Sequence, residues 1–152
     1  MSATSALQKL GLQLPPVAAP VAAYVPAVTV GNQVHTSGQL PFVDGQLPAT
    51  GKVGAEISEK EAYEYARTSA LNALAAIDAQ VGLDNVTRVI KVVVFVASAP
   101  DFYGQPQVAN GASELVGDVF GEAGIHARSA VGVAVLPKNS PVEVEVVVEA
   151  RV

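Results

Sequence analysis

Cysteine and tryptophan are absent from this chain, and histidine occurs only twice. Without cysteine the protein has no disulfide bond, no thiolate nucleophile and no cysteine-ligated metal. The two histidines, His35 and His126, are far apart in sequence, lack metal-site spacing, and more often than not are surface or satisfied core residues. No convincing glycine-rich phosphate loop or Ser/His/Asp order is present. We therefore expect no metal and no cofactor.

Charged residues are scarce, at 15% of the chain, and nine basic residues face fourteen acidic ones. The net charge of -5 repels a polyanion unless basic side chains cluster, and no such cluster stands out in the sequence. A nucleic-acid partner is therefore not expected. The low charge, combined with 50% hydrophobic residues, leaves apolar surface for contacts between subunits.

No run approaches the 18 apolar residues that indicate a transmembrane helix. Prolines at positions 15, 16, 20 and 26 break any signal-sequence helix in the first thirty residues, so a cytoplasmic location without a membrane partner is the simplest expectation. Residues 1–20 are small, Pro-rich and without period, and they predict an N-terminal arm that orders only if something docks on it. Residues 21–152 have the length of one domain.

Apolar runs bounded by Gly, Pro or Asn predict five strands, over residues 24–30, 33–38, 87–98, 129–136 and 142–151. A capping box, Ser58 with Glu61, opens a helix that Gly82 ends, and apolar spacing predicts a second helix within 105–120. The nearly unbroken apolar run 87–98 is typical of a strand that is central or covered on both faces. The last two strands flank a Pro-rich turn and predict an antiparallel hairpin.

This order of elements predicts an α+β domain with two helices on one face of the sheet. Because the sequence has no third helical layer, we expect another subunit to cover the other face, in a closed symmetric ring.

Arg128 stands at the start of a predicted strand, among small and apolar residues, so its charge needs a partner. A guanidinium presents a planar fork of donors that matches a carboxylate two bonds at a time, which makes an organic acid a natural ligand. The alternative is an ion pair within the protein. Glu143, Glu145 and Glu149 alternate with valines, as in any half-exposed strand. By default, Tyr24, Ser37 and Asn110 are sheet-edge, turn and cap residues.

If the final hairpin pairs symmetrically about its turn, Glu143 faces Val135. Arg128 then lies seven residues further along, about 23 Å away at 3.3 Å per residue. Those two residues of one chain cannot share a small ligand. A joint site therefore requires Arg128 from one subunit and Glu143 from its neighbour.

Several blocks resemble the reactive intermediate deaminase family, also called Rid, YjgF or L-PSP endoribonucleases. ARSAVGVAVLPKNSPVEVEVVVEA (127–150) is similar to the family's Ala-Arg-Ser strand, Leu-Pro-Lys turn and acidic-alternating strand. HTSGQLP (35–41) resembles its Thr-Ser-Gly-Gln-x-Pro, Leu71-Asn72 its helical Leu-x-Asn, and VVVFVASAPDF (92–102) its strand ending in Asp-Phe. The resemblance spans residues 24–152 and implies a chorismate-mutase-like fold, in which two helices pack on one face of a mixed sheet. It also implies a homotrimer with sites between subunits.

By this resemblance, Arg128 holds the substrate carboxylate and Glu143 positions or activates the attacking water. The positions that match the rest of the pocket are Tyr24, Ser37, Gly38, Asn110 and Ala130; Asn110 matches across several extra residues after Phe102. Ala22-Ala23-Tyr24 replaces the family's Gly-Pro-Tyr, Ala130 stands where many members have Cys, and Gly132 stands where Glu is frequent. These departures bear on the choice of substrate.

The resemblance implies a cofactor-free hydrolase, an enamine/imine deaminase of the 2-iminobutanoate/2-iminopropanoate type. It would convert 2-aminoacrylate-type intermediates to 2-oxo acids and ammonia. One alternative is a regulatory module that binds a small carboxylate without turnover. Another is the ribonuclease activity in the family's name, against which the acidic net charge weighs.

Overall fold

The computed structural model describes residues 1–17, 19 and 22–152. Its strands and α-helices, in chain order, are α1 (Ala3–Lys9), β1 (Ala27–Val30), β2 (Gln33–Thr36), α2 (Glu59–Val81), β3 (Val86–Ala97), α3 (Gln105–Phe120), β4 (Ala127–Val133) and β5 (Val142–Ala150). Short 3-10 turns, η1 (Leu83–Asn85), η2 (Gly121–Gly124) and η3 (Pro137–Asn139), lie in three of the connections. All five predicted strands and both predicted helices are present.

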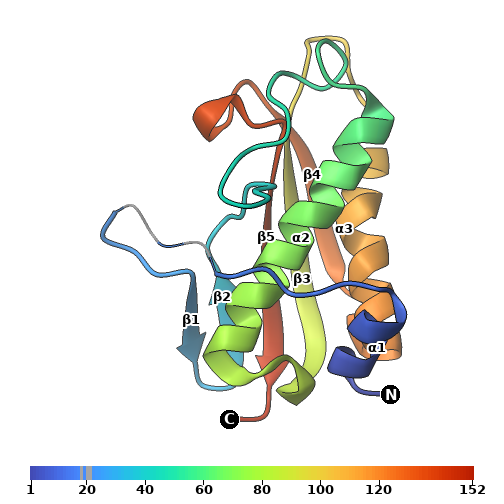
Figure 1. Ribbon diagram of the computed structural model, residues 1–152. Coiled ribbons are helices and arrows are strands. Elements are labelled where there is room, and N and C mark those ends of the chain that lie inside the picture. The colour runs from blue at the N-terminus through green and yellow to red at the C-terminus, as the bar shows by residue number, and fades with distance from the viewer. Residues whose placement is uncertain (18, 20–21) are drawn as a thin grey trace.

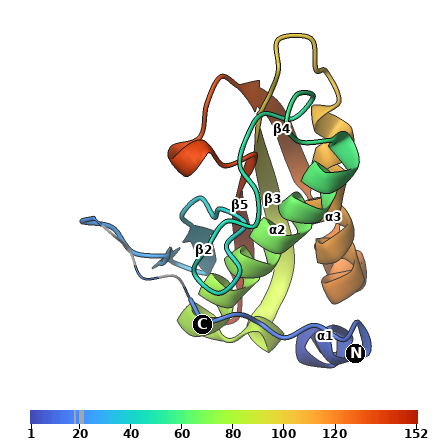
Figure 2. The same cartoon turned by 45° about the horizontal axis from the view of Figure 1, so that its top comes forward.

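The strands form one sheet in the order β1-β2-β5-β3-β4, in which β3 and β4 are parallel and all other neighbours antiparallel. Figures 1 and 2 show α2 and α3 side by side on one face of this sheet. The predicted α+β fold with a mixed sheet and helices on one face is therefore confirmed. The interior position predicted for the run 87–98 is also confirmed, because β3 lies between β5 and β4.

The long helix α2 begins and ends as the sequence predicts. The Ser58 hydroxyl accepts a hydrogen bond from the Glu61 backbone N–H at 3.1 Å, and the Glu61 side chain accepts one from the Ser58 N–H at 3.3 Å. This reciprocal pair satisfies two donors that a helix start otherwise leaves open. Gly82 follows the last turn at φ 81°, a left-handed conformation that glycine adopts without strain.

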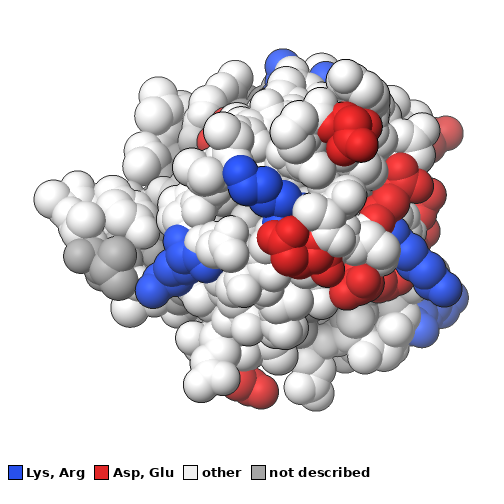
Figure 3. Space-filling model, turned by 90° about the horizontal axis from the view of Figure 1, so that it is seen from above, with Lys and Arg blue, Asp and Glu red and all other residues white. Residues whose placement is uncertain are grey.

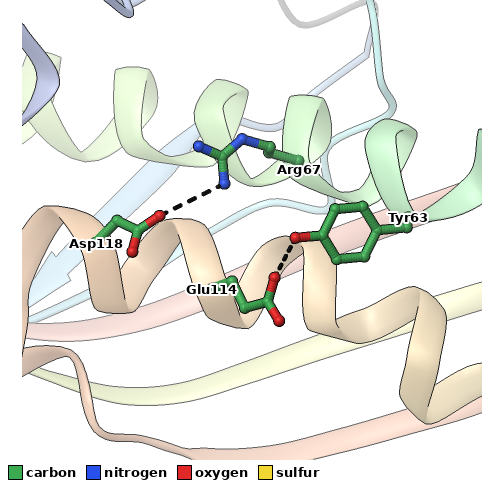
Figure 4. Close-up of polar contacts among 4 residues, drawn as sticks. All are labelled: Tyr63, Arg67, Glu114 and Asp118. Atoms are coloured by element: carbon green, nitrogen blue, oxygen red, sulfur yellow. Dashed lines mark hydrogen bonds and ion pairs between the residues drawn. The ribbon is translucent and has the colours of Figure 1, made fainter. Parts of the chain in front are cut away.

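Helices α2 and α3 approach each other closely at Gly111. A β-carbon at that position would lie 2.9 Å from the carbonyl carbon of Tyr63, so any larger residue would push the helices apart. Gly111 lowers the helix propensity of α3, and this contact is the physical reason for it. Beside it, Tyr63 donates to Glu114 and Arg67 pairs with Asp118 at 3.9 Å (Figure 4).

The predicted hairpin between the last two strands is wrong. β4 is an edge strand that pairs with β3, with Arg128 opposite Val92, whereas β5 lies on the other side of β3, with Glu143 opposite Phe95. The cause is α3: a helical crossover joins β3 to β4, and such a connection places two strands parallel and adjacent. Residues 134–141 then lead the chain to the opposite side of β3.

The first ten residues also differ from the expected irregular arm. Ala3–Lys9 form α1, whose residues Ala3, Ala6 and Leu7 are buried, and the Thr4 N–H and hydroxyl donate to the two carboxylate oxygens of Asp84 at 2.9 and 3.0 Å. Apolar burial and this carboxylate dock the helix on its own chain, which the proline-rich composition of residues 1–20 did not reveal. The arm's predicted boundary at residues 20 and 21 lies outside the described residues.

The two faces of the sheet differ in their burial. On β5 the residues that face the helices are 0% exposed, namely Val142, Val144, Val146 and Val148. Their neighbours Glu143, Glu145, Val147 and Glu149 face away and are partly exposed. None of the helices in the described part of the chain packs on this second face, and its coverage by another subunit stays a prediction.

Among the described residues, no helix combines the length and apolar character needed to cross a bilayer.

Candidate functional site

The Arg128 side chain lies on the helix-covered side of β4. Arg128 pairs with Val92, which is buried under the helices, so its side chain meets α3. Its Nη1 atom donates to Asn110 Oδ1 at 2.8 Å and to Ser113 Oγ at 3.2 Å. The two acceptors lie three residues apart on α3 and therefore project from the same face of that helix.

Ser113 is itself oriented by His126, on the chain just before β4. His126 Nδ1 lies 2.6 Å from the Gly124 carbonyl oxygen, which can only accept, so Nδ1 carries the hydrogen. In the neutral ring Nε2 is then an acceptor, and it takes the Ser113 hydroxyl hydrogen across 2.9 Å. The lone pairs of Ser113 Oγ are left for Arg128, so His126 fixes Ser113 as an acceptor for the guanidinium.

These contacts leave one edge of the guanidinium open. Both N–H groups of Nη1 are occupied by neutral oxygens, while the Nη2 and Nε donors have no hydrogen-bond partner among the described residues. Arg128 has no acidic partner there either, since the ion pair of the described chain joins Arg67 to Asp118. The alternative of an internal ion pair is therefore not realised in the described residues. The Nη2 and Nε N–H groups on this edge can donate two parallel hydrogen bonds to one carboxylate.

Glu143 lies on the opposite face of the sheet, in a cavity of about 210 Å³, here called the Glu143 cavity. Its lining includes Tyr24, Gly38, Phe42 and Lys138. A β-carbon at Gly38 would lie 2.7 Å from the Glu143 carboxyl carbon, so only glycine lets the carboxyl rest against this backbone. The segment is held there by two backbone hydrogen bonds between Gln39 and Val144, of 2.8 and 3.0 Å.

Burial raises the pKa of the Glu143 carboxyl above its ordinary value, and the negative charge of Glu145 raises it further. Both effects disfavour the ionised form, because a buried charge loses hydration and a like charge repels it. When ionised, such a carboxylate is a stronger base than an ordinary exposed glutamate. It can accept a proton from a bound water molecule.

The other predicted residues divide between these two places. Tyr24 lines the Glu143 cavity with half of its surface exposed. Ser37 donates its hydroxyl hydrogen to the Val25 carbonyl at 2.6 Å and so supports the segment that carries Tyr24. Ala130 pairs with Val94 on the helix-covered side, two residues beyond Arg128. The structure therefore groups Asn110 and Ala130 with Arg128, and Tyr24 and Gly38 with Glu143.

Within one chain, Arg128 and Glu143 do not meet. Their partners on β3 are three residues apart and the strands are two positions apart, which separates the two α-carbons by about 14 Å rather than 23 Å. Their side chains point to opposite faces of the sheet. The expectation that one chain cannot bring both residues to one small ligand therefore holds, for a different geometric reason.

Sequence reasoning missed Ser113, His126 and Lys138 as site residues. Ser113 follows Asn110 by three positions on a predicted helix, so helical periodicity places both side chains on the same face. His126 precedes Arg128 by two positions in extended chain, so strand periodicity places these two side chains on the same side. Lys138 lies in the predicted Leu-Pro-Lys turn, and apart from its charge nothing in the sequence indicates that it lines a cavity.

The described site joins a mixed sheet, helices on one face, an arginine with an open edge, and a half-buried glutamate on the other face. A model of the family described as "YjgF/chorismate mutase-like, putative endoribonuclease" matches residues 4–150. The chain belongs to this family, and the resemblance stated from the sequence is confirmed. TCP17 of Trypanosoma cruzi is 50% identical over 145 residues, which are 94% of this chain and 91% of TCP17.

Another relative carries an activity in its name. The 2-iminobutanoate/2-iminopropanoate deaminase of Escherichia coli is 36% identical over 135 residues, covering 88% of this chain and 91% of the relative. Among solved structures, Atu1372 of Agrobacterium tumefaciens has a TM-score of 0.92 at 42% identity, covering 98% of this chain and 92% of its own. Escherichia coli TdcF, solved with bound serine, has a TM-score of 0.65 at 31% identity, covering 91% and 94%.

Proposed function

We propose that this protein is a cofactor-free imine deaminase that hydrolyses 2-iminopropanoate-type intermediates to 2-oxo acids and ammonia. The observation that carries the proposal is the open Nη2–Nε edge of Arg128, held by neutral oxygens of α3 and free of any acidic partner in the described chain. The raised pKa of Glu143 and the deaminase named among the relatives support it.

In this mechanism the Arg128 fork binds the substrate carboxylate and sets the C2 carbon in position. Glu143 takes a proton from a water molecule whose oxygen attacks C2, and the C=N electron pair moves to nitrogen, which takes that proton from the Glu143 carboxyl. The hydroxyl group of the resulting carbinolamine then gives its proton to Glu143, which passes it to nitrogen as the C–N bond breaks. Ammonia leaves, the 2-oxo acid is formed and the Glu143 carboxylate is regenerated. Positioning together with one general base, about 10²- to 10⁴-fold for the base alone, suffices for an imine that already hydrolyses in water.

Tyr24 is the better donor to the imine nitrogen or to the water. It lines the same cavity as Glu143, whereas the Ser37 hydroxyl hydrogen is already donated to the Val25 carbonyl. The proposal assigns Ser37 the supporting role and Tyr24 the contact with substrate.

The proposed site is formed between subunits of a homotrimer, with Arg128 from one subunit and Glu143 from the next. Opposite faces of one sheet cannot serve one small ligand, whereas two neighbouring subunits can place those faces together. In a closed ring, every subunit then contributes one half to each of two sites.

Complementation between two inactive variants tests this arrangement. Arg128→Ala and Glu143→Gln proteins are co-expressed with different affinity tags, and oligomers carrying both tags are assayed for iminopropanoate hydrolysis. A shared site predicts recovery of about one third of wild-type activity in these mixed trimers, because one of their three interfaces pairs the two intact residues. Each variant alone is the control and stays inactive.

Two results would contradict the proposal in different ways. Wild-type rates in the Arg128→Ala protein would remove the activity assignment. Inactive single variants that show no recovery in mixed oligomers would place both residues in one subunit's site, as would full activity in a monomeric protein.

The serine bound to TdcF favours a second candidate function, binding of a small carboxylate without turnover. Arg128 would be needed in that case and Glu143 would not. A Glu143→Gln protein separates the two functions: a deaminase loses turnover while it still binds pyruvate, whereas a binding module has no turnover to lose.

The ribonuclease activity in the family's description is disfavoured by charge. The net charge is -5, and on the face that Figure 3 shows, basic and acidic side chains lie beside one another without a continuous basic surface. A polyanion binds where cations cluster.

A further inference from the structure

We infer that the cavity beside the Glu143 cavity is a subsite for a bulky apolar side chain, so that the preferred substrates are 2-imino acids with branched aliphatic or aromatic side chains. This inference rests on the proposed deaminase function and adds the substrate class. It comes from the second cavity, here called the outer cavity, whose volume is about 510 Å³.

The two cavities are neighbours and share part of their walls. Phe42 and Lys138 line both of them, while Glu143 lines only the smaller one. A ligand whose reacting carbon lies at Glu143 therefore extends past Phe42 into the outer cavity. The shared wall is fixed in place, because the Asn72 side chain on α2 donates to the Leu40 and Phe42 carbonyl oxygens at 3.0 and 3.1 Å.

The volumes favour a substrate larger than the alanine-derived imine. Small-molecule sites span about 300 to 1,000 Å³. The Glu143 cavity, at about 210 Å³, is below that range and suits the common imino-acid head group, whereas the outer cavity at about 510 Å³ is within it. A three-carbon imine would leave the outer cavity empty of substrate.

The lining indicates the chemistry of the group that enters. Pro15, Pro16, Val17 and Phe42 form an apolar wall, and both amide hydrogens of Asn72 are already used. The charged residues Asp44 and Lys138 are exposed and of opposite sign, so their charges offset each other and select no ion. An apolar side chain gains by leaving water against such a wall.

The N-terminal segment supplies Pro15, Pro16 and Val17 of that wall. Docking of α1 through buried Leu7 and through the Thr4–Asp84 hydrogen bonds fixes the start of this segment. The chain that follows α1 then passes across α2 (Figure 1). The early residues thus have a role in specificity that lies outside the chemistry of Arg128 and Glu143.

The test compares imines made in situ from leucine, alanine and glutamate, in wild-type protein and in a Val17→Trp variant that fills the outer cavity. Leu10→Trp is the matched control, since Leu10 lies in the same N-terminal region, lines neither described cavity, and is 38% exposed against 37% for Val17. We expect wild-type kcat/KM to be about 10-fold higher for the leucine imine than for the alanine imine. Val17→Trp removes this preference and leaves the alanine rate unchanged, whereas Leu10→Trp keeps the preference.

A wild-type preference for the alanine or glutamate imine overturns the inference. It is also overturned if Val17→Trp lowers both rates equally or changes neither. Val17→Ala, which widens the cavity, provides a second variant should the tryptophan disturb folding, and its preference for the leucine imine must not fall below that of the wild type.

Failure of the proposed function is separable from failure of the subsite. If no imine is hydrolysed faster than in buffer, the deaminase proposal fails. Dissociation constants for 4-methyl-2-oxopentanoate and pyruvate then test the subsite without turnover. Tighter binding of the larger acid that is lost in Val17→Trp supports it, and equal affinities overturn it.

Discussion

The surroundings of Arg128 and Glu143 have opposite effects on the charge of the two side chains. Arg128 is exposed and is held by neutral oxygens of Asn110 and Ser113, so its charge is oriented without being neutralised. Glu143 is half-buried next to another carboxylate, so its negative charge is disfavoured and its pKa is raised. Neutral support keeps a cation available for an anion, and an unfavourable setting makes a carboxylate a stronger base. In the proposed function, the two faces of one sheet carry complementary halves of an acid-binding hydrolytic site.

The largest effect is expected from removing the Arg128 fork. Arg128→Ala should lower kcat/KM for iminopropanoate by about 100-fold or more, because two charge-assisted hydrogen bonds to the carboxylate are lost. Arg128→Lys keeps the charge without the fork and should retain intermediate activity. Steady-state kinetics and pyruvate affinity measure both effects. Equal activity of the Ala and Lys variants would show that the fork geometry is unimportant.

A smaller effect should follow from loosening the support of Arg128. Ser113→Ala removes one acceptor of Nη1 and should raise KM by about 10-fold with a lesser change in kcat, because the arginine acts mainly on the substrate carboxylate. Ser113→Thr restores the hydroxyl and should restore KM.

Two readouts distinguish positioning from general destabilisation in this variant. Tyr63→Phe removes another side-chain hydrogen bond, the one between α2 and α3 in Figure 4, and should leave KM unchanged. The imidazole ¹⁵N signals of His126 should report loss of the hydrogen bond at Nε2 in Ser113→Ala alone. An unchanged KM in that protein would argue against a positioning role.

The smallest effect is expected from Glu145, which acts on Glu143 only through its charge. A general base must be ionised, so activity should rise with pH through the pKa of Glu143. This rising limb of the pH–activity profile should lie at higher pH than for an ordinary glutamate, because the pKa of Glu143 is raised. Glu145→Gln removes one of the two causes of the raised pKa and should move this limb to lower pH, while burial keeps it above the ordinary value. Glu149→Gln, on the same strand and face, is the control. A limb that shifts to higher pH in Glu145→Gln would contradict this account.

Local signals predicted the elements well. The Ser58/Glu61 box and Gly82 marked both ends of α2, and helical spacing located α3. Such signals act within a few residues along the chain, so the sequence carries them directly. The pairing of β4 was predicted wrongly because strand neighbours are chosen by the whole sheet: α3 carries the chain over to the far edge of β3, and closeness in sequence to β5 has no influence on that.

The site shows the same division. Arg128 and Glu143 were singled out by residue type and by family resemblance, yet the sequence does not show that Ser113 and His126 share a hydrogen bond or that Gly38 lies against the Glu143 carboxyl. Both contacts join segments that meet only when helix, loop and sheet pack together.

Apart from α1, residue order alone determined which segments became helix or strand, and it determined which side chains could bind an acid or activate water. Propensity, capping and ionisation are properties of residues and their near neighbours. Tertiary structure alone decided that the arginine faces α3, that the glutamate occupies a cavity on the other face, and that the N-terminal segment lines the cavity next to it. Those outcomes depend on contacts between distant parts of the chain, whose energies are settled only when the sheet and helices pack as a whole.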